Sequence, residues 1–366
     1  MAIDLTGAGR HTTGVAYYSL SAARAVALAG GPKVDVSVLR HYSLRRPGAV
    51  LEHRDLRSRW APWPREALHR LPALDERTRF RPDRPVEVFH ASETVLRPVS
   101  ARAVVVTVHD LGALRGTVPP GGADLPRTRR RFAEALERAD AVLVVSEAAR
   151  RDLEAVFPRQ AGRARVVYPA PLPAVPRPVP GCPEPFVAFV GATNGRKDLD
   201  VLLRAVARLR HRGEWPADLA LVLAGPAGDA EGDLARLAAE LGLGELLRRL
   251  GYLPDDGAVE WLIRHARCFA YPGRHEGFGF PAIRAMAGRV PVVACAAGAI
   301  PEVTAGAAAL FDPGDDAGLA EVLGAVLHDG EVRERMGAAG AERAAAFSPE
   351  AFGAGLLEVY REVVGA

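Results

Sequence analysis

The stretch CFAYPGRHEGFGFPAIRAM, residues 268–286, contains the pattern on which the fold depends. A short apolar run is followed by a turn with two glycines and by a proline, Pro281, that suits the first position of a helix. Strand, turn and helix in this order predict one repeat of a parallel α/β sheet. Ligands of such sheets bind at the carboxyl ends of the strands, so the acid in this turn, Glu276, is a candidate ligand-binding residue.

The same alternation continues along the chain in both directions. Apolar runs rich in β-branched residues alternate with alanine- and arginine-rich helical patterns, which predicts parallel strands covered by helices on both faces. The predicted strands lie at 34–39, 86–91, 103–110, 141–146, 186–192, 219–226, 268–273, 291–295 and 308–312. A proline-rich segment, 169–185, interrupts the alternation, because proline continues neither helices nor central strands.

These boundaries predict an α/β protein of two doubly wound, Rossmann-like domains. The first domain is expected at 1–170, a proline-rich linker at 171–185 and the second domain at 186–346. The amphipathic segment 347–366 predicts a C-terminal helix. The first strand, within MAIDL, is short, which suggests a truncated start.

The composition is that of an ordinary globular protein. Of 366 residues, 49% are hydrophobic and 25% charged, and the net charge is +3 with a pI of about 8.9. This mild charge falls short of the basic surface of nucleic-acid-binding proteins, so nucleic acid is not an expected partner. The sequence shows neither a signal peptide nor a run long enough to span a bilayer, so a cytoplasmic location is expected. Arginine-rich segments leave open a peripheral contact with an anionic membrane.

The sequence predicts neither a metal nor an organic cofactor. Its three cysteines, Cys182, Cys268 and Cys295, form no CxxC pair and have no His cluster at metal-ligand spacing, so they are expected to be reduced thiols. The glycine-rich turn at 5–18 does not match GxGxxG, and no acid follows at the ribose-binding distance. A dinucleotide cofactor is therefore not expected.

Residues 40–85 have no clear period and combine arginines, prolines and tryptophans. One interpretation is an irregular helical insertion in the first domain. The other is a basic face that engages an acceptor or a membrane, although charge runs are usually solvated.

Two turns of the first domain carry candidate site residues. The turn at 5–18 leads into Gly14 and fits a flexible substrate loop. His109 and Asp110 end the predicted strand 103–110. A histidine in this place is often structural, but followed directly by an acid it is also a candidate for holding a polar substrate.

The first strand of the second domain ends in GATNGRKDLDVLLRAV, residues 191–206. Gly191 frees the backbone, and Arg196 and Lys197 precede a helix expected to begin near residue 198. Two cations beside a helix N-terminus favour phosphate, whereas the alternative is a pair of solvated surface cations. Lys197 is one of only two lysines in the chain, which favours the phosphate site.

The opening stretch adds an acid and an unexpected cation. Gly277 and Gly279 can expose backbone N–H groups to a ligand. Glu276 would repel phosphate, so it is expected to face hydroxyls or a developing positive charge. Arg284 is expected in the opening turn of the helix, where the free N–H groups and the macrodipole favour an anion, so it needs a partner.

Residues 186–316 resemble the donor-binding domain of the retaining glycosyltransferases of family 4, which have the GT-B fold and use nucleotide-diphosphate sugars. The motifs that carry this resemblance are FVGATNGRKDLDVLL (189–203), LGYLPDDGAVEWLIRHA (250–266), YPGRHEGFGFPAIRAMAGRVPVVA (271–294) and GAIPEV (298–303). The first half matches more loosely through TTGVAYYSL, VFHAS, TVHDL and ADAVLVVSEAARRDL. The resemblance therefore covers nearly the whole chain.

The resemblance implies roles for individual residues. Arg196 and Lys197 would hold the diphosphate, Glu276 would touch the hydroxyls of the donor sugar and His109 would lie near the sugar ring, which makes these four the catalytic candidates. The implied donor-binding residues are Gly191, Leu253 beside the nucleobase, Gly277, Phe278, Gly279, Arg284 and Glu302. The implied acceptor-binding residues are Gly14, Val15 and Tyr17.

The resemblance also implies a mechanism. The diphosphate would leave and the acceptor would attack on the same face of the sugar, with fixed cations in place of a metal ion. The C-terminal helix would return to the first domain. The implied partners are a nucleotide-sugar donor and a hydroxyl-bearing acceptor, which is a glycan, a lipid-linked acceptor or a small molecule.

One departure from the family concerns Arg284. The family usually has a second glutamate eight positions after the first, where it accepts from the ribose hydroxyls, whereas arginine can only donate. Three hypotheses follow: the donor lacks the 2′-hydroxyl, as in a thymidine nucleotide; Arg284 pairs with Glu276 or Glu302 or binds phosphate; or donor binding has decayed.

The sequence therefore favours a metal-independent retaining glycosyltransferase that serves cell-envelope polysaccharide or secondary metabolism. One alternative is a non-catalytic protein that binds sugar nucleotides, which Arg284 suggests. The other is a sugar-nucleotide epimerase of the same architecture, although the motifs of that class are absent from the second half.

Overall fold

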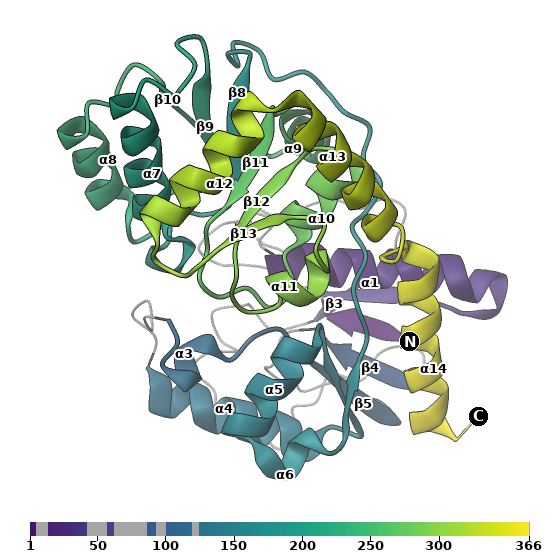
Figure 1. Ribbon diagram of the computed structural model, residues 1–366. Coiled ribbons are helices and arrows are strands. Elements are labelled where there is room, and N and C mark those ends of the chain that lie inside the picture. Colours follow the sequence, from purple (N-terminus) through teal and green to yellow (C-terminus); the bar gives the residue numbers. More distant parts are fainter. Residues whose placement is uncertain (5–13, 42–56, 62–85, 93–99, 119–123, 366) are drawn as a thin grey trace. The chain divides into compact units, whose positions relative to one another are not determined.

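The computed structural model describes residues 1–4, 14–41, 57–61, 86–92, 100–118 and 124–365. The chain forms two compact units (Figure 1). Unit 1 comprises Met1–Arg115, Ala123–Leu172 and Phe347–Ala366, and unit 2 comprises Gly116–Gly122 and Pro173–Ala346. Each unit is built around its own parallel sheet.

The sheet of unit 1 has seven strands in the order β3-β2-β1-β4-β5-β6-β7, and every described pair is parallel. The strands are β1 (Ala2–Asp4), β2 (Ser37–His41), β3 (Arg57–Ala61), β4 (Val88–Ala91), β5 (Ala103–Val108), β6 (Ala141–Val144) and β7 (Ala164–Val166). All residues of β4 and β6 are buried, which fits central strands covered on both faces.

Three helices of unit 1 begin at side-chain caps. The helices of this unit are α1 (Gly14–Gly30), α3 (Gly112–Arg115), α4 (Leu125–Arg138), α5 (Glu147–Val156), α6 (Pro158–Ala161) and α14 (Pro349–Val364), with a 3₁₀ turn η1 (Gly31–Lys33) after α1. The side chains of Asp124, Ser146 and Ser348 accept backbone N–H groups in the first turns of α4, α5 and α14.

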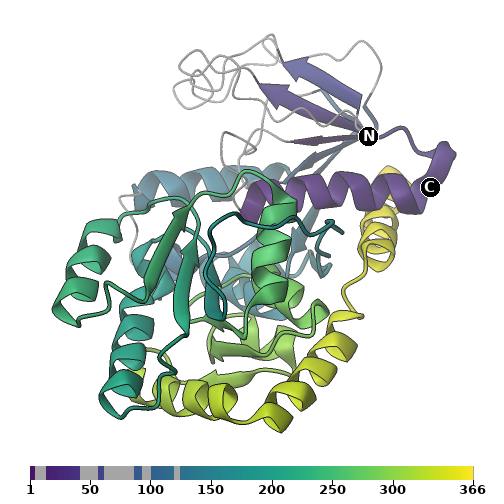
Figure 2. The same cartoon turned by 90° about the horizontal axis from the view of Figure 1, so that it is seen from above.

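The last helix, α14, packs against the first, α1, so helices from opposite ends of the sequence lie side by side in unit 1 (Figures 1 and 2). The contact is close at Gly353, where an added Cβ would lie 2.1 Å from the carbonyl oxygen of Ala25. Glycine at this position therefore lets the two helix backbones approach each other.

The sheet of unit 2 has six strands in the order β10-β9-β8-β11-β12-β13, again all parallel. The strands are β8 (Phe186–Val190), β9 (Ala220–Ala224), β10 (Leu247–Gly251), β11 (Cys268–Tyr271), β12 (Val292–Cys295) and β13 (Ala309–Phe311). The helices are η3 (Gly195–Lys197), α7 (Leu199–His211), α8 (Glu231–Glu240), α9 (Asp256–His265), α10 (Phe280–Ala287), α11 (Ile300–Thr304), α12 (Asp316–His328) and α13 (Gly330–Ala344).

The predicted alternation of parallel strands and helices is confirmed in both units. Three strands were missed, because β7 and β10 are partly exposed and rich in arginine, while β3 lies inside the segment 40–85. The expectation of an irregular helical insertion is wrong at 57–61, and 42–56 and 62–85 lie outside the described residues. Within the described part of the chain, no helix is both long enough and apolar enough to cross a bilayer.

Candidate functional site

The carboxyl edge of the unit 2 sheet brings two of the predicted turns together. Strands β8 and β11 are neighbours in the sheet, so the turns that follow them lie side by side. The first turn carries Arg196 and Lys197 in η3, and the second carries Glu276. Residues that are 79 positions apart in the chain thus come into contact at the carboxyl edge of the sheet, where the sequence predicted Glu276 to lie.

Glu276 lies between two cations. Its Oε1 accepts from Nζ of Lys197 at 2.5 Å, and its Oε2 lies 3.6 Å from a guanidinium nitrogen of Arg196. The same guanidinium donates to the carbonyl oxygen of His275 at 3.1 Å. Glu276 and Lys197 are more than nine-tenths buried, whereas the Arg196 side chain is 34% exposed.

Tyr271, at the end of β11, completes this group of side chains, which we call the Glu276 cluster (Glu276, Lys197, Arg196 and Tyr271). Its hydroxyl donates to Glu276, and its ring lies 5.3 Å from the Lys197 ammonium. Burial raises the pKa of Tyr271 well above its usual value, and the carboxylate of Glu276 adds to this effect. Sequence analysis missed Tyr271, because an apolar strand masks a polar group at its last residue.

The charge of Glu276 is maintained by its cations. Burial by itself raises the pKa of this carboxyl group, but the attraction of Lys197 and Arg196 outweighs burial and lowers the pKa below its usual value. Glu276 is therefore ionised at neutral pH. Together, its carboxylate and the two cations leave one net positive charge at the edge of the sheet.

A second ion pair fixes the two turns to each other. Nε of Arg274 donates to both carboxylate oxygens of Asp198 at 2.7 Å. Asp198 is buried and has a left-handed backbone, with φ of 48°, between η3 and α7. This pair joins the residue after Lys197 to the residue two positions before Glu276, so it holds both halves of the cluster in register.

Backbone packing holds Glu276 from the other side. Gly298, in the turn after β12, has φ of +59°, and a Cβ there would lie 2.6 Å from the carbonyl oxygen of Glu276. The same carbonyl accepts from the N–H of Ala299 at 2.9 Å. Gly298 thus lets a third turn approach the Glu276 backbone, in a motif (GAIPEV) that was noticed in the sequence without this role.

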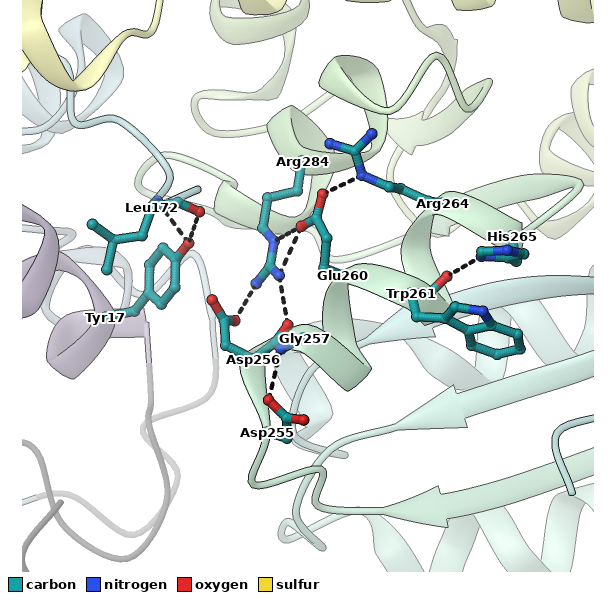
Figure 3. Close-up of polar contacts among 10 residues, drawn as sticks. All are labelled: Tyr17, Leu172, Asp255, Asp256, Gly257, Glu260, Trp261, Arg264, His265 and Arg284. Atoms are coloured by element: carbon teal, nitrogen blue, oxygen red, sulfur yellow. Dashed lines mark hydrogen bonds and ion pairs between the residues drawn. The ribbon is translucent and has the colours of Figure 1, made fainter. Parts of the chain in front are cut away.

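Arg284 has other partners than the Glu276 or Glu302 that the sequence suggested. Its Nε donates to Glu260 at 2.9 Å, and a terminal nitrogen donates to Asp256 at 2.7 Å (Figure 3). Another nitrogen donates to the carbonyl oxygen of Asp256 at 3.1 Å. Both acids come from α9, so Arg284 connects α10 to α9.

Arg264 extends this second group, which we call the Arg284 cluster (Arg284, Asp256, Glu260 and Arg264). Nε of Arg264 donates to the other oxygen of Glu260 at 2.5 Å. Arg284 and Glu260 are both more than nine-tenths buried. The two cations and two anions leave no net charge.

The helix position predicted for Arg284 is wrong. Helix α10 begins at Phe280 rather than Pro281 and ends at Ala287, so Arg284 lies in its last turn. Carbonyl groups gather at that end, and a cation there is favoured by the macrodipole. The cation therefore conflicts with neither the helix nor its surroundings.

The remaining donor-side candidates also lie in unit 2. Gly191 follows β8 and donates its N–H to Ala224 at 2.9 Å. Gly279 caps α10 with φ of 96°. The other positions are Leu253, half-buried between β10 and α9; Gly277, half-buried in the turn; Phe278, buried with its ring against Phe280; and Glu302 in α11, whose carbonyl accepts from Arg343.

His109 lies in unit 1, half-buried directly after β5. Its Nε2 is 2.7 Å from the carbonyl oxygen of Ser92, which can only accept, so Nε2 carries a proton. Burial lowers the pKa of His109, although the Ser92 carbonyl and Asp110 oppose the effect. In the neutral ring Nδ1 is therefore a hydrogen-bond acceptor.

The acceptor-side candidates all lie at the start of α1, in unit 1. Gly14 is exposed and begins the helix, and Val15 is half-buried. Tyr17 is buried, and its hydroxyl donates to the carbonyl oxygen of Leu172 at 3.3 Å and accepts from the N–H of the same residue at 2.8 Å. This hydroxyl thus ties the start of α1 to the last residue of the segment Ala123–Leu172 of unit 1. Residues 5–13 of the same predicted loop lie outside the described residues.

The three cysteines are free thiols. Cys268 and Cys295 are buried in the core, whereas Cys182 is only half-buried. Burial raises the pKa of Cys268 to about 12, so its thiol is protonated at neutral pH. Among the residues that the structure describes, no group of three or more His, Cys, Asp or Glu residues is arranged to hold a metal ion.

Comparison with known proteins places the chain in a family. The glycosyl transferases group 1 model matches residues 180–343, and the glycosyltransferase family 4 model matches residues 12–170. The O-antigen chain mannosyltransferase B of Escherichia coli is 31% identical over 284 residues, which is 72% of this chain and 71% of that protein. The chain belongs to the group 1, family 4 glycosyltransferases.

A second relative matches this glycosyltransferase chain over only part of its length. The D-inositol 3-phosphate glycosyltransferase of Nocardia farcinica is 38% identical over 182 residues. This match covers 48% of the chain and 40% of that enzyme. The chain thus spans less than half of the length of this relative.

The fold is found among solved structures. The Anabaena protein HepE, in its complex with UDP and glucose, superposes with a TM-score of 0.73 at 17% identity. The alignment covers 99% of this chain and 100% of HepE. The two parallel units are thus those of the GT-B fold, as predicted.

Proposed function

We propose that this protein transfers a sugar from a nucleotide-diphosphate sugar to a hydroxyl acceptor with retention of the anomeric configuration. The observation that carries the proposal is the Glu276 cluster, where a buried carboxylate lies between two cations at the ligand-binding edge of a parallel sheet. The excess positive charge suits a diphosphate, and the carboxylate suits sugar hydroxyls. Family membership and the name of the mannosyltransferase relative support the same reaction class.

The proposed reaction exchanges one bond at the anomeric carbon. The bond between that carbon and the diphosphate oxygen breaks, and the electron pair stays on the diphosphate. The acceptor oxygen then forms the new bond from the same face, and its proton passes to the departing diphosphate oxygen. Arg196 and Lys197 would stabilise the charge that develops on the diphosphate, a task that fixed cations can perform in place of a metal ion.

Glu276 and His109 would both accept hydrogen bonds from the donor sugar. Glu276 is ionised and accepts only, and the Ser92 contact leaves Nδ1 of His109 as an acceptor. Hydroxyl-rich ligands donate readily to such groups. His109 is thus proposed to orient the sugar, and neither residue needs to form a covalent intermediate.

Arg284 is proposed to be structural. Its guanidinium is engaged by Asp256 and Glu260, which gives its charge a reason that does not involve the donor. The ribose would then be recognised by other groups, or would lack a hydroxyl, as in a thymidine nucleotide. The binding-only alternative was suggested by Arg284 in place of the family's second glutamate, and the ion pairs with α9 give that arginine a structural role.

The acceptor is proposed to be a hydroxyl of a glycan, a lipid-linked glycan or a small polyol. The names of the two relatives support this range, since one is an O-antigen chain mannosyltransferase and the other a D-inositol 3-phosphate glycosyltransferase. Exposed arginines on α4, including Arg130 and Arg138, suit a peripheral contact with anionic lipid from the cytoplasmic side. Flotation with vesicles containing phosphatidylglycerol would test that contact.

Calorimetry with uridine, guanosine, adenosine and thymidine diphosphates tests the proposed site. One nucleotide is expected to bind the wild type, and Arg196→Ala is expected to weaken binding about tenfold or more. Arg236→Ala is the matched control, because Arg236 is an exposed arginine of unit 2 that pairs with Asp233. Equal binding by wild type and Arg196→Ala would contradict the assignment.

Product analysis tests the reaction itself. With the matching nucleotide sugar and candidate acceptors, free nucleoside diphosphate and a glycoside with the donor's anomeric configuration are expected by NMR. Binding without turnover across an acceptor panel would favour the binding-only alternative. A changed sugar without release of nucleotide would favour the epimerase.

A further inference from the structure

A chain of buried polar groups in unit 1 connects the last helix to the first. The Tyr360 hydroxyl of α14 lies 2.6 Å from Nδ1 of His90 in β4. Nε2 of His90 lies 2.6 Å from Oγ1 of Thr107 in β5. This Oγ1 lies 3.0 Å from the hydroxyl of Tyr18 in α1. Three hydrogen bonds thus join α14, the sheet and α1 in the interior.

The histidine in the middle of this chain is neutral. Burial, with a smaller contribution from His109, lowers the pKa of His90 to about 3. A neutral imidazole has one N–H donor and one acceptor, so His90 donates a hydrogen bond to one of Tyr360 and Thr107 and accepts one from the other. Loss of either neighbour leaves a buried ring nitrogen without its hydrogen bond.

The far end of the chain supports His109. The Tyr18 ring meets the His109 ring edge-on, with centroids 4.7 Å apart and planes at 87°. Phe352 of α14 packs on the same Tyr18 ring at 5.6 Å. The last helix therefore holds Tyr18 in two ways, through the ring of Phe352 and through the hydrogen-bonded chain from Tyr360.

His109 is held from another side by the backbone after β4. Its Nε2–H donates to the Ser92 carbonyl, and the Ser92 hydroxyl lies 2.6 Å from the hydroxyl of Ser19 in α1. The orientation of His109 thus depends on one hydrogen bond and on the Tyr18 ring packed against it.

We propose that Tyr360, His90 and Thr107 are positioning residues for His109, because they fix the Tyr18 ring that packs against it. The C-terminal helix thereby helps to orient His109, although Tyr360 lies some 250 positions after His109 in the chain. The consequence for catalysis rests on the proposed function, in which Nδ1 of His109 accepts from the donor sugar.

The test compares Tyr360→Phe and Thr107→Val with the wild-type protein by histidine ¹⁵N NMR. Both substitutions remove one hydroxyl at nearly constant shape. Each is expected to shift the His90 and His109 ring nitrogen signals and to raise the pKa of His109 toward its ordinary value, because a looser ring is better solvated. The His109 signals are assigned by their loss in His109→Asn.

Ser21→Ala is the matched control. Ser21 is a fully buried α1 residue whose hydroxyl donates to the Ala170 carbonyl at 2.5 Å, outside the chain from Tyr360. Ser21→Ala should leave the His109 signals unchanged. Thr107→Ser keeps the hydroxyl that Thr107→Val removes, so its His109 signals should match those of the wild type. Equal shifts in Ser21→Ala and Tyr360→Phe, or none in either, would overturn the proposal.

Kinetics then separates this inference from the proposed function. In an active transferase, Tyr360→Phe should lower kcat roughly ten- to a hundredfold, with an unchanged KM for the donor, because the diphosphate is held in unit 2. If no transfer is found with any donor, the NMR comparison still decides the positioning role. A normal kcat alongside shifted His109 signals would contradict the catalytic consequence alone.

Discussion

The central residues of the two ion clusters, Glu276 and Arg284, are buried and lie eight positions apart in the chain, but the charges around them have opposite arrangements. In the Glu276 cluster one anion lies between two cations. In the Arg284 cluster a cation lies between two anions, and Arg264 balances the second of them. The first leaves a net positive charge, and its Arg196 is 34% exposed. The second is neutral: Arg284 and Glu260 are buried, whereas Asp256 and Arg264 are each 43% exposed.

This difference separates a binding site from a structural crosslink. Charges that a protein buries for stability alone have to be balanced within the fold, because an unbalanced buried charge is costly. An unbalanced cluster is tolerated where a ligand of opposite charge completes it. In the proposed function, Glu276 and its neighbours would bind the donor, whereas the ion pairs of Arg284 hold α10 against α9.

The largest expected effect comes from reversing the charge of Arg284. Arg284→Glu would place a third carboxylate beside Asp256 and Glu260, and it should destabilise the protein by about 3–5 kcal/mol. Arg284→Lys should cost less, since it keeps the charge and loses the fork. Urea unfolding measures both, with exposed Arg236→Glu as the control. A stable Arg284→Glu protein with an altered nucleotide preference would show that Arg284 belongs to the nucleotide site and is not a structural crosslink.

Replacing Lys197 should lower activity more than stability, which is the reverse of what we expect for Arg284→Glu. Lys197→Met keeps the buried stem but removes one of the two cations of the cluster, and it should lower kcat about 10²–10³-fold. Its effect on stability should be smaller than that of Arg284→Glu, because Arg196 and Tyr271 still engage Glu276. Rate and unfolding measurements on the same two variants test this. If Lys197→Met lost much stability and kept full activity, Lys197 would be a structural residue and not part of the binding site.

Gly298→Ala should disturb Glu276 through the backbone. Strain and the contact with the Glu276 carbonyl should together cost about 1–3 kcal/mol and weaken nucleotide binding. Gly306→Ala is the matched control, since Gly306 also has a positive φ but an added Cβ would meet no atom within 4 Å. If both variants bind nucleotide equally well, the contact with Glu276 is unimportant.

The smallest effect is expected from acid. The pKa of Glu276 is lower in the folded protein than in the unfolded chain, so its ionisation stabilises the fold above about pH 4.5. As the pH falls below 4.5 the unfolded chain binds the proton first, and stability should fall by up to about 1.4 kcal/mol per pH unit. Glu276→Gln should lack this part of the pH dependence. Equal slopes for the two proteins would show that Glu276 is not held by its cations.

Much of the architecture could be predicted because it is written in local patterns. Apolar runs marked β5, β8, β9 and β12, and the glycines, prolines and charged residues after them marked the turns. Strands without that pattern were missed: β10 carries two arginines and is partly exposed, and β3 lies in a segment without a clear period. Periodicity detects buried strands better than edge strands.

By itself the sequence determined the family and the placement of Lys197 and Glu276 in turns after parallel strands, whose carboxyl ends lie at one edge of a sheet. Only the tertiary structure decided the partners of Arg284 and the proton position on His109. Asp256 lies 28 residues from Arg284, and Ser92 lies 17 residues from His109. These contacts depend on how helices and loops pack around the strands, and no local spacing in the chain specifies that packing.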